Sequence, residues 1–330
     1  MKIQSFLVSA IGLVLAGCSA AGFGSSHTAS KIFDENDYDR GIAVFTEKVR
    51  AEPRSAVNNY YLGRFYLAES MVDQALLYLN RAVSLKQNDS DYQFWLGMAA
   101  GAAGDQREER RRYEKALQIN SYHAKAKMYL AHLELKEGRY RQALKFYDDL
   151  LRKYPYNAAA LYNRALSLQF LDNRDEEQKA WRKYLKYYPA GFLATKATDH
   201  LNRLGDFTFR NHPFGYRTIT VKELKFSDDD PRISSRDAMR FVGTVLANLS
   251  AGDLQISVFV DGNSDLARRR AENIKKFLLN EYPRLQSDRI RLSWFGEPEI
   301  LHGNGQKFVL SESTRFYLIN WQEGLAGGKV

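Results

Sequence analysis

One pattern of residues returns every 34 positions between residues 37 and 189, and it limits the possible fold more than any other feature of the chain. Its first column holds proline or a polar residue in five successive periods: Pro53, Gln87, Ser121, Pro155 and Pro189. A large side chain stands eight residues before each of these: Phe45, Leu79, Tyr113, Tyr147 and Trp181. Small residues fill further columns: Ala75 and Ala143, Ala82 and Ala116, and the pairs Leu62-Gly63, Leu96-Gly97 and Leu130-Ala131. The period predicts an array of two-helix units, in which small residues let helices approach, large side chains fill the space between them and proline ends the second helix.

This pattern resembles the tetratricopeptide repeat (TPR), and the resemblance implies an all-α solenoid over residues 37–204. Four complete helix pairs are predicted: 57–68 with 71–85, 92–103 with 106–119, 123–136 with 140–153, and 158–171 with 176–187. Residues 192–204 predict one more amphipathic helix, which would cap the open end of the array. The first unit is expected to lack its first helix, because residues 22–31 are mostly small and polar.

The first 17 residues have the features of a secretory signal peptide. Lys2 precedes an apolar run over residues 6–16, which is too short to cross a bilayer as a stable helix. The run leads into Leu-Ala-Gly-Cys at residues 15–18, and Cys18 is the one cysteine of the sequence, so no internal disulfide can form. Two interpretations fit: an ordinary signal peptide followed by an incidental cysteine, or a site of lipid attachment.

Leu-Ala-Gly-Cys resembles the lipobox of bacterial lipoproteins. The resemblance implies that Cys18 is acylated, becomes the mature N-terminus and anchors the protein, since each buried methylene contributes about 0.8 kcal/mol. Ser19 stands where an Asp tends to retain such lipoproteins in the inner membrane, which implies the periplasmic face of the outer membrane. Residues 18–36 are mostly small and polar, and we expect them to form a flexible tether.

The TPR resemblance also implies a partner-binding groove lined by the first helix of each pair. By analogy, the groove residues are Tyr60, Arg64, Phe94, Met98, Lys125, Met128, His132, Tyr162, Leu166 and Phe170. This set is apolar with cationic edges, which suits an amphipathic protein segment with acidic flanks, or a C-terminal carboxylate. The alternative is that several of these side chains only pack against the neighbouring repeat.

The composition changes at residues 205–217, which contain Gly, Pro and Asn and are expected to form a linker. The period then becomes two, and residues 218–322 predict an α/β domain, followed by a tail at residues 323–330. The predicted order is βαβαββ: strand 216–226, helix 234–249, strand 254–260, helix 265–282, strand 289–295 and strand 315–321.

That order resembles the OmpA-like domain, and three motifs support the resemblance: Leu-Ala-Arg-Arg-Arg-Ala-Glu-Asn-Ile at 266–274, Arg-Ile at 289–290 before Gly-Glu-Pro at 296–298, and Ser-Thr-Arg at 313–315. The family binds the diaminopimelate of peptidoglycan, with an Arg for its carboxylate and an Asp for its ammonium. Arg270 matches the Arg. In the shortened loop, either Asp261 takes the role of the Asp, or Asn263 occupies the position without its charge.

The net charge of +9 fits nucleic acid, anionic lipid, a polyanionic glycan or a solvated basic surface, and the predicted export argues against nucleic acid. The sequence shows no nucleophile with a plausible base, no Gly-rich phosphate loop and no histidine pair at ligand spacing. We therefore expect no enzyme activity, no metal and no cofactor. A wall-acting enzyme remains the alternative with least support.

The architecture resembles the TPR lipoproteins of the TadD and PilF types. The predicted function is a protein–protein scaffold for assembly of an envelope machine, a pilus or a secretion system, whose last domain docks on peptidoglycan. The alternative is a peptidoglycan tether whose repeats recruit cell-wall hydrolases or synthases. If Arg270 and Asp261 face one pocket, tethering is favoured, and if Arg270 lies in a salt bridge, assembly is favoured.

Overall fold

The computed structural model describes residues 24–226, 233, 236–248, 252–303 and 305–319, and the chain divides into two compact units between Lys153 and Tyr154. The signal peptide predicted at residues 1–17, the lipidation predicted at Cys18 and the tail predicted at 323–330 lie outside these residues. In the described chain, no helix is long and apolar enough to cross a membrane.

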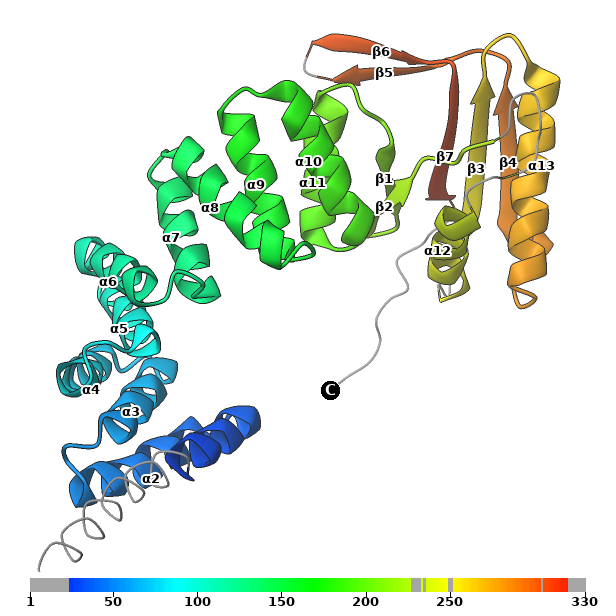
Figure 1. The fold of residues 1–330 in the computed structure, drawn as a ribbon. Helices are drawn as coiled ribbons and strands as arrows, with labels where there is room; N and C mark the ends of the chain where they lie inside the picture. Colours follow the sequence, from blue (N-terminus) through cyan, green and yellow to red (C-terminus); the bar gives the residue numbers. More distant parts are fainter. Residues whose placement is uncertain (1–23, 227–232, 234–235, 249–251, 304, 320–330) are drawn as a thin grey trace, which may run out of the picture. The chain divides into compact units, whose positions relative to one another are not determined.

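The first unit is a series of helices that pack in chain order (Figure 1). A helix over residues 24–35 precedes α2 (Tyr38–Ala51), α3 (Ala56–Ala68), α4 (Val72–Leu85), α5 (Ser90–Ala102), α6 (Gln106–Ile119), α7 (Ala124–Lys136) and α8 (Tyr140–Lys153). Side-chain oxygens of Ser55, Asp89 and Asp105 accept hydrogen bonds from first-turn N–H groups, which explains where α3, α5 and α6 begin. The predicted helical repeat is confirmed.

The repeating columns of the sequence are the contacts between these helices. The large column is fully buried at Phe45, Leu79, Tyr113 and Tyr147, and the small column is fully buried at Ala75, Ala82, Ala116 and Ala143. A Cβ added at Gly63 would lie 2.6 Å from Cγ of Leu79, and one added at Gly97 would lie 2.7 Å from the ring of Tyr113. Each helix pair therefore approaches at a distance that only glycine permits at these two positions.

The flexible tether expected over residues 18–36 is wrong for residues 24–35, which form the first helix of the first repeat. Ser25 donates a hydrogen bond of 2.7 Å to Asn58, and Ala29 and Ile32 are buried. The ring of Phe33 stacks on that of Phe65 with centroids 4.2 Å apart. Small polar residues do not favour a helix by themselves, but packing on α2 and α3 overrides that weak preference.

The second unit begins with α9 (Ala158–Phe170), α10 (Arg174–Tyr187) and α11 (Phe192–Arg203). Trp181 of α10 continues the large column and is fully buried. The predicted terminal helix is α11, and its Ala194, Ala197 and Leu201 are fully buried. It packs on α10 and also on β1, so strands cover part of the face that a simple cap would leave to solvent.

The strands of the second unit form three small sheets (Figure 1). β1 (Phe209–Phe214) and β2 (Arg217–Lys222) form an antiparallel hairpin, as do β5 (Glu299–Gly303) and β6 (Gln306–Leu310). In the third sheet β3 (Asp253–Val260) lies between a parallel β4 (Ile290–Phe295) and an antiparallel β7 (Glu312–Ile319). Helices α12 (Arg236–Ala247) and α13 (Ser264–Glu281) share one core with β3, whose Leu254, Ile256, Val258 and Val260 are buried.

The predicted strand and helix order is present, with two additions. The linker expected at residues 205–217 contains β1, which pairs with β2, and the hairpin β5–β6 lies between the last two predicted strands. Both were missed because neither alternates between apolar and polar residues as a half-buried strand does. Arg210 and His212 of β1 are buried, whereas Ile300 of β5 and Val309 of β6 are exposed.

Candidate functional site

The groove predicted for the first unit is centred on one arginine held between aromatic rings. The guanidinium of Arg64 lies 4.3 Å from the ring centre of Phe33 and 4.2 Å from that of Trp95, and it donates a hydrogen bond of 3.3 Å to the hydroxyl of Tyr60. Nε of Arg64 is buried without a hydrogen-bond partner in the described part of the chain. A cation fixed in this way is ready to receive an anionic group with little loss of side-chain entropy.

An acidic residue lies near this cation. His123 accepts a hydrogen bond from the N–H of Ala126 through Nδ1, and its Nε2 lies 3.0 Å from the carboxylate of Asp91. The hydrogen bond with His123 holds the pKa of Asp91 below its usual value, with smaller contributions from the charges of Lys125 and Arg64. Asp91 therefore stays ionised and offers a partner one negative site beside the cations.

The predicted groove residues divide by exposure. Tyr60 and Phe94 are buried and act in packing, and Tyr60 stacks on Tyr92 with centroids 4.5 Å apart. Arg64, Met98, Met128 and His132 are half-buried, and Lys125 is exposed. In the second unit Tyr162 and Leu166 are half-buried, and Phe170 is exposed. Phe33, Asp91 and Trp95 were missed, Phe33 because its helix was not recognised.

His132 is half-buried beside Tyr129 and Tyr147. Burial lowers the pKa of its imidazole, so the ring is neutral at pH 7. Its Nε2 has no hydrogen-bond partner among the described residues, and within those residues no three potential ligands gather as a metal site. This histidine therefore adds no charge to the groove.

Arg270, predicted to bind a ligand carboxylate, already has a protein partner. Its side chain is 2% exposed, and Nη1 lies 2.9 Å from the carboxylate of Glu312. The guanidinium also lies 4.5 Å from the ring centre of Phe226. Asp261 is exposed, while the side chain of Asn263 accepts a hydrogen bond of 2.9 Å from the N–H of Leu266 and begins α13. Of the two arrangements set out above, the salt bridge is the one observed.

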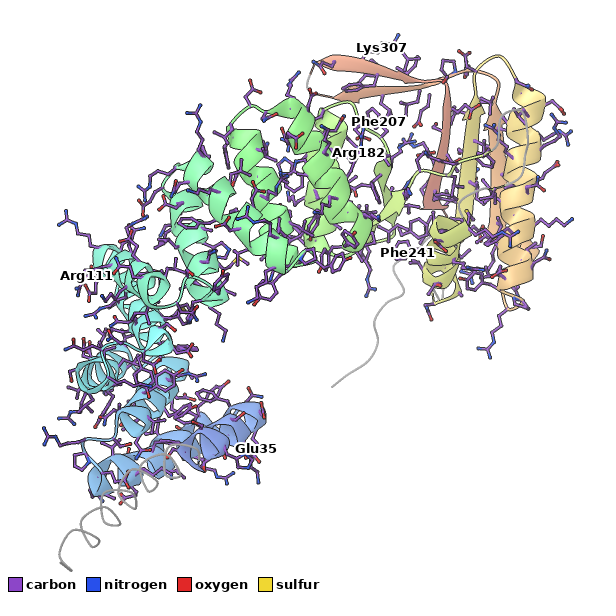
Figure 2. All side chains as sticks on the ribbon, in the orientation of Figure 1. Glu35, Arg111, Arg182, Phe207, Phe241 and Lys307 are labelled. Carbon is purple, nitrogen blue, oxygen red and sulfur yellow. The ribbon has the colours of Figure 1, made fainter. Side chains whose placement is uncertain are left out.

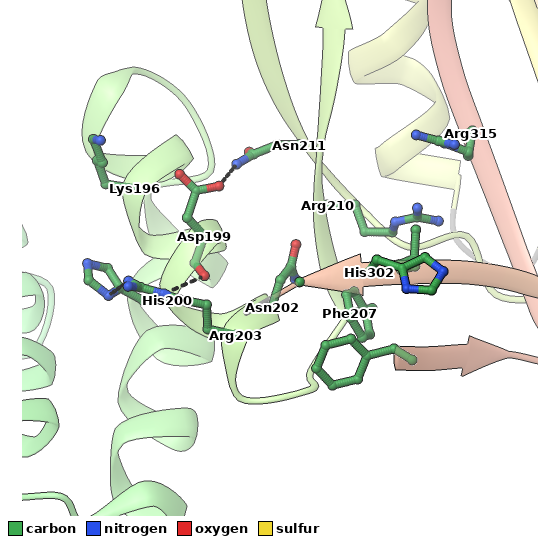
Figure 3. A pocket seen from close by; sticks show the side chains of 13 residues that line it. Lys196, Asp199, His200, Asn202, Arg203, Phe207, Arg210, Asn211, His302 and Arg315 are labelled. Carbon is green, nitrogen blue, oxygen red and sulfur yellow. Dashed lines mark hydrogen bonds between the residues drawn. The ribbon is translucent and has the colours of Figure 1, made fainter. Parts of the chain in front are cut away.

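A cavity of about 690 Å³ in the second unit was not predicted at all (Figure 3). It is bordered by α11, by β1 and by the β5–β6 hairpin. Among the described residues that line it, Asp199 contributes the one carboxylate. Four cationic side chains also line it: Lys196, Arg203, Arg210 and Arg315. The apolar part of the wall includes Phe207 and Phe308, whose rings meet edge to face with centroids 5.2 Å apart.

One carboxylate behind the wall serves two of these arginines. Arg210 is buried and forms a two-point ion pair with Glu299, at 2.8 and 3.0 Å. Nε of Arg315 lies 3.2 Å from the same carboxylate, and Ser313 donates to it as well. Burial alone would raise the pKa of Glu299, but the bonds from Arg210 and Ser313 hold it below its usual value. The carboxylate of Glu299 thus pairs with two arginines, and a second carboxyl group, that of Glu223, lies 3.8 Å from Arg210.

The histidine of α11 adds no charge to the cavity. His200 stacks on buried Trp181, with ring centroids 4.8 Å apart, and Arg203 donates a hydrogen bond to its Nδ1. Burial, with the charge of Arg203, lowers the pKa of His200 to about 4. The ring is therefore a neutral acceptor at pH 7 that positions Arg203 at the mouth of the cavity.

No protein-family model and no curated protein sequence matches the chain. The helical part has the fold of a TPR-like solenoid. It is similar to the structure of Pseudomonas aeruginosa PilF, with 13% identity, a TM-score of 0.50, and coverage of 57% of this chain and 90% of that chain.

Two further solved structures are similar to this part of the chain. PilW, described as a type IV pilus biogenesis factor, has 16% identity and a TM-score of 0.49, and the match covers 55% of this chain and 86% of PilW. YrrB, described as a TPR protein with an unusual peptide-binding site, has 19% identity and a TM-score of 0.45, and the match covers 52% of this chain and 88% of YrrB. At such identities the likeness concerns the fold alone.

Proposed function

We propose that this protein is a non-enzymatic scaffold for assembly of a pilus or secretion machine, lipid-anchored at the periplasmic face of the outer membrane. The observation that carries the proposal is the aromatic-flanked Arg64 on the first-helix face of a TPR-like solenoid. The choice of machine rests on the resemblance to the TPR lipoproteins of the TadD and PilF types, and the similar fold of PilF is in line with it by analogy.

The partner of the first unit is an amphipathic protein segment with an acidic flank. Met98 and Met128 are half-buried and give an apolar, adaptable surface, while Arg64 and Lys125 supply the charges. An acidic group of the partner would pair with the half-buried guanidinium of Arg64. This fit follows the helix-in-groove mode of recognition.

Deletion of the gene is expected to abolish surface pili or secretion, and Arg64→Gln is expected to fail to restore them. Arg111→Gln is the matched control, because Arg111 is 64% exposed and belongs to α6, a second helix of its pair and not a groove-lining first helix (Figure 2). A photo-crosslinking residue at Met98 should capture a component of the machine, while one at exposed Glu114 should not. A deletion strain with normal pili and normal secretion would contradict the proposal.

Lipid attachment at Cys18 is proposed from the lipobox resemblance. Radiolabelled palmitate should enter the parent protein and should not enter Cys18→Ser. Outer-membrane placement is tested by Ser19→Asp, which should move the protein to the inner-membrane fraction. Unlabelled parent protein would show that Cys18 is incidental to an ordinary signal peptide.

Docking on peptidoglycan by an OmpA-like domain remains a second proposal, and the ion pair Arg270–Glu312 sets its test. A wall carboxylate that binds Arg270 must displace Glu312, so Glu312→Gln should increase co-sedimentation with purified sacculi. Asp261→Asn should decrease it if Asp261 binds the ammonium. If the parent and both variants stay in the supernatant, the domain has no wall-binding role.

A further inference from the structure

Two residues of α11 that line the cavity occupy groove positions in the register of the repeat. Lys196 and His200 of α11 stand 34 residues after Tyr162 and Leu166 of α9, which are groove positions of the repeat. The ring of Tyr162 meets that of Trp181 edge to face, with centroids 5.1 Å apart, and Trp181 in turn stacks on His200, with centroids 4.8 Å apart. An apolar surface on α9 therefore leads to a basic surface on α11 within one unit.

The β5–β6 hairpin turns that basic surface into a pocket. Figure 3 shows Lys196 and Arg203 on α11 at one side of the cavity and Arg315 and His302 at the other. Phe308 of β6 supplies an apolar wall against Phe207. The space is large enough for several residues of a peptide and much larger than one phosphate or carboxylate needs.

The charges of the wall are left unbalanced. Arg210 is paired with Glu299 and lies 3.8 Å from Glu223, whereas Arg315 shares the carboxylate of Glu299 and remains about half exposed, at 49%. Arg203 donates to neutral acceptors, the ring of His200 and the carbonyl oxygen of Asp199. The carboxylate of Asp199 accepts a hydrogen bond of 2.8 Å from the side-chain amide of Asn211. Lys196 packs its ammonium 5.5 Å from the ring centre of Phe192 and adds a further positive charge.

We infer that this cavity binds an acidic segment of a protein partner, whose carboxylates pair with Lys196, Arg203 and Arg315 while its apolar side chains lie against Phe308 and the α9 surface. The inference rests on the proposed scaffold function and names a second, separate contact for its partner. A peptide is favoured over a small anion because the cavity is much larger than one anion needs and has aromatic side chains in its wall. Guanidinium groups at the rim give directional pairing with carboxylates.

The test measures fluorescence anisotropy of a labelled octapeptide of alternating Glu and Leu with the purified full chain. The parent should bind this peptide, and the Gln and Leu counterpart should bind at least about tenfold more weakly. The double variant Lys196→Gln with Arg203→Gln should lose about tenfold or more in affinity for the acidic peptide. Lys183→Gln, which removes an exposed charge from α10, is the matched control and should bind like the parent.

Three results would overturn the inference. The first is that the parent does not bind the acidic peptide. The second is that the double variant binds it as tightly as the parent and has an unchanged circular dichroism spectrum. The third is that the parent binds the Gln and Leu peptide as tightly as the acidic one. Inorganic phosphate serves as a competitor, and full displacement of the peptide at phosphate concentrations matching that of the peptide would reassign the cavity to a small anion. The result is separable from the scaffold proposal, because crosslinking at Met98 and the Arg64→Gln phenotype concern the first unit alone.

Discussion

The repeat helices and the strand-containing part of the second unit are stabilised by different kinds of interior. The helices bury columns of apolar and small residues that recur along the chain, such as Tyr113 with Ala116. Their buried carboxylate Glu134 pairs with Arg110, which is partly exposed. The strand-containing part instead buries both members of an ion pair, Arg210–Glu299, which joins residues 89 positions apart. An apolar interior tolerates gradual change, whereas a buried ion pair fails when either partner is lost.

The largest loss of stability is expected from a change in the apolar interior of the repeat helices. Trp181→Ala removes a fully buried indole that also supports His200, and it should lower the free energy of unfolding by about 3–5 kcal/mol. Hydrogen exchange should show the loss in α9, α10 and α11. Leu77→Ala, at a side chain that is 57% exposed, is the control and should change exchange little. Equal effects of the two changes would contradict the buried-column description.

The buried ion pair gives the next effect. Glu299→Gln removes the two-point partner of buried Arg210 and leaves only the carboxyl group of Glu223, 3.8 Å away, so it should cost about 3 kcal/mol in unfolding free energy. The paired replacement Arg210→Met with Glu299→Leu should regain most of that loss, since it removes both charges together. Chemical denaturation measures both. A double variant as unstable as the single one would show that packing, rather than charge, decides this site.

A smaller effect depends on pH. Burial raises the pKa of Glu223 to about 7, against the opposing charge of Arg210 at 3.8 Å. The protonated form therefore favours the folded state, and this contribution is complete below about pH 4.5 and is lost as the pH rises through 7. Because the side chain is 22% exposed, we expect a change of about 1–2 kcal/mol.

Glu223→Gln removes this titration and keeps an acceptor for the N–H of Thr314. The free energy of unfolding of the parent, relative to that of the variant, should therefore fall between pH 5 and pH 8. His212 and His200 are present in both proteins, so their titration does not affect this difference. Chemical denaturation at several pH values provides the measurement. A constant difference across this range would show that Glu223 titrates as an ordinary exposed glutamate.

The smallest effect concerns a helix end. Asp105 accepts a hydrogen bond of 3.0 Å from the N–H of Glu108 at the start of α6, so Asp105→Ala should cost about 1 kcal/mol. Asp105→Asn should keep most of the stability, because its amide oxygen accepts the same bond. Thermal unfolding of the two variants separates capping from charge at the helix start. Equal losses would point to charge as the main term.

The contrast between the two interiors explains what could be predicted from the sequence. Gly63 and Trp181 were interpretable because their contacts lie at fixed offsets within a repeat. Arg210 resembles a linker residue until Glu299, far along the chain, is known to face it. Ser25 gave no helix signal, since its helix depends on packing against α3.

The candidate sites follow the same division. The register of the repeat predicted Arg64 and Lys125 as groove residues. In the structure Arg64 is half-buried and Lys125 is exposed on first helices of their pairs. The cavity was missed because its wall includes Arg315 and Phe308, which strands bring to α11 from more than a hundred residues away. Charged residues that line such a cavity recur at no fixed spacing in the sequence, and the strands of an exposed hairpin show only a weak alternation of apolar and polar residues.

The helix over residues 24–35 changes how far the proposed lipoprotein can stand from its membrane. With a tether over the predicted range, the first packed residue would follow Cys18 by 19 positions, a contour of up to about 65 Å. With Ser25 and Ala29 packed, the first packed residue follows Cys18 by 7 positions, a contour of at most about 24 Å. The volume that the body can sample grows with the cube of that reach, so the shorter length would hold the first repeat near the lipid headgroups. Partners of this repeat would then be those that approach the bilayer itself.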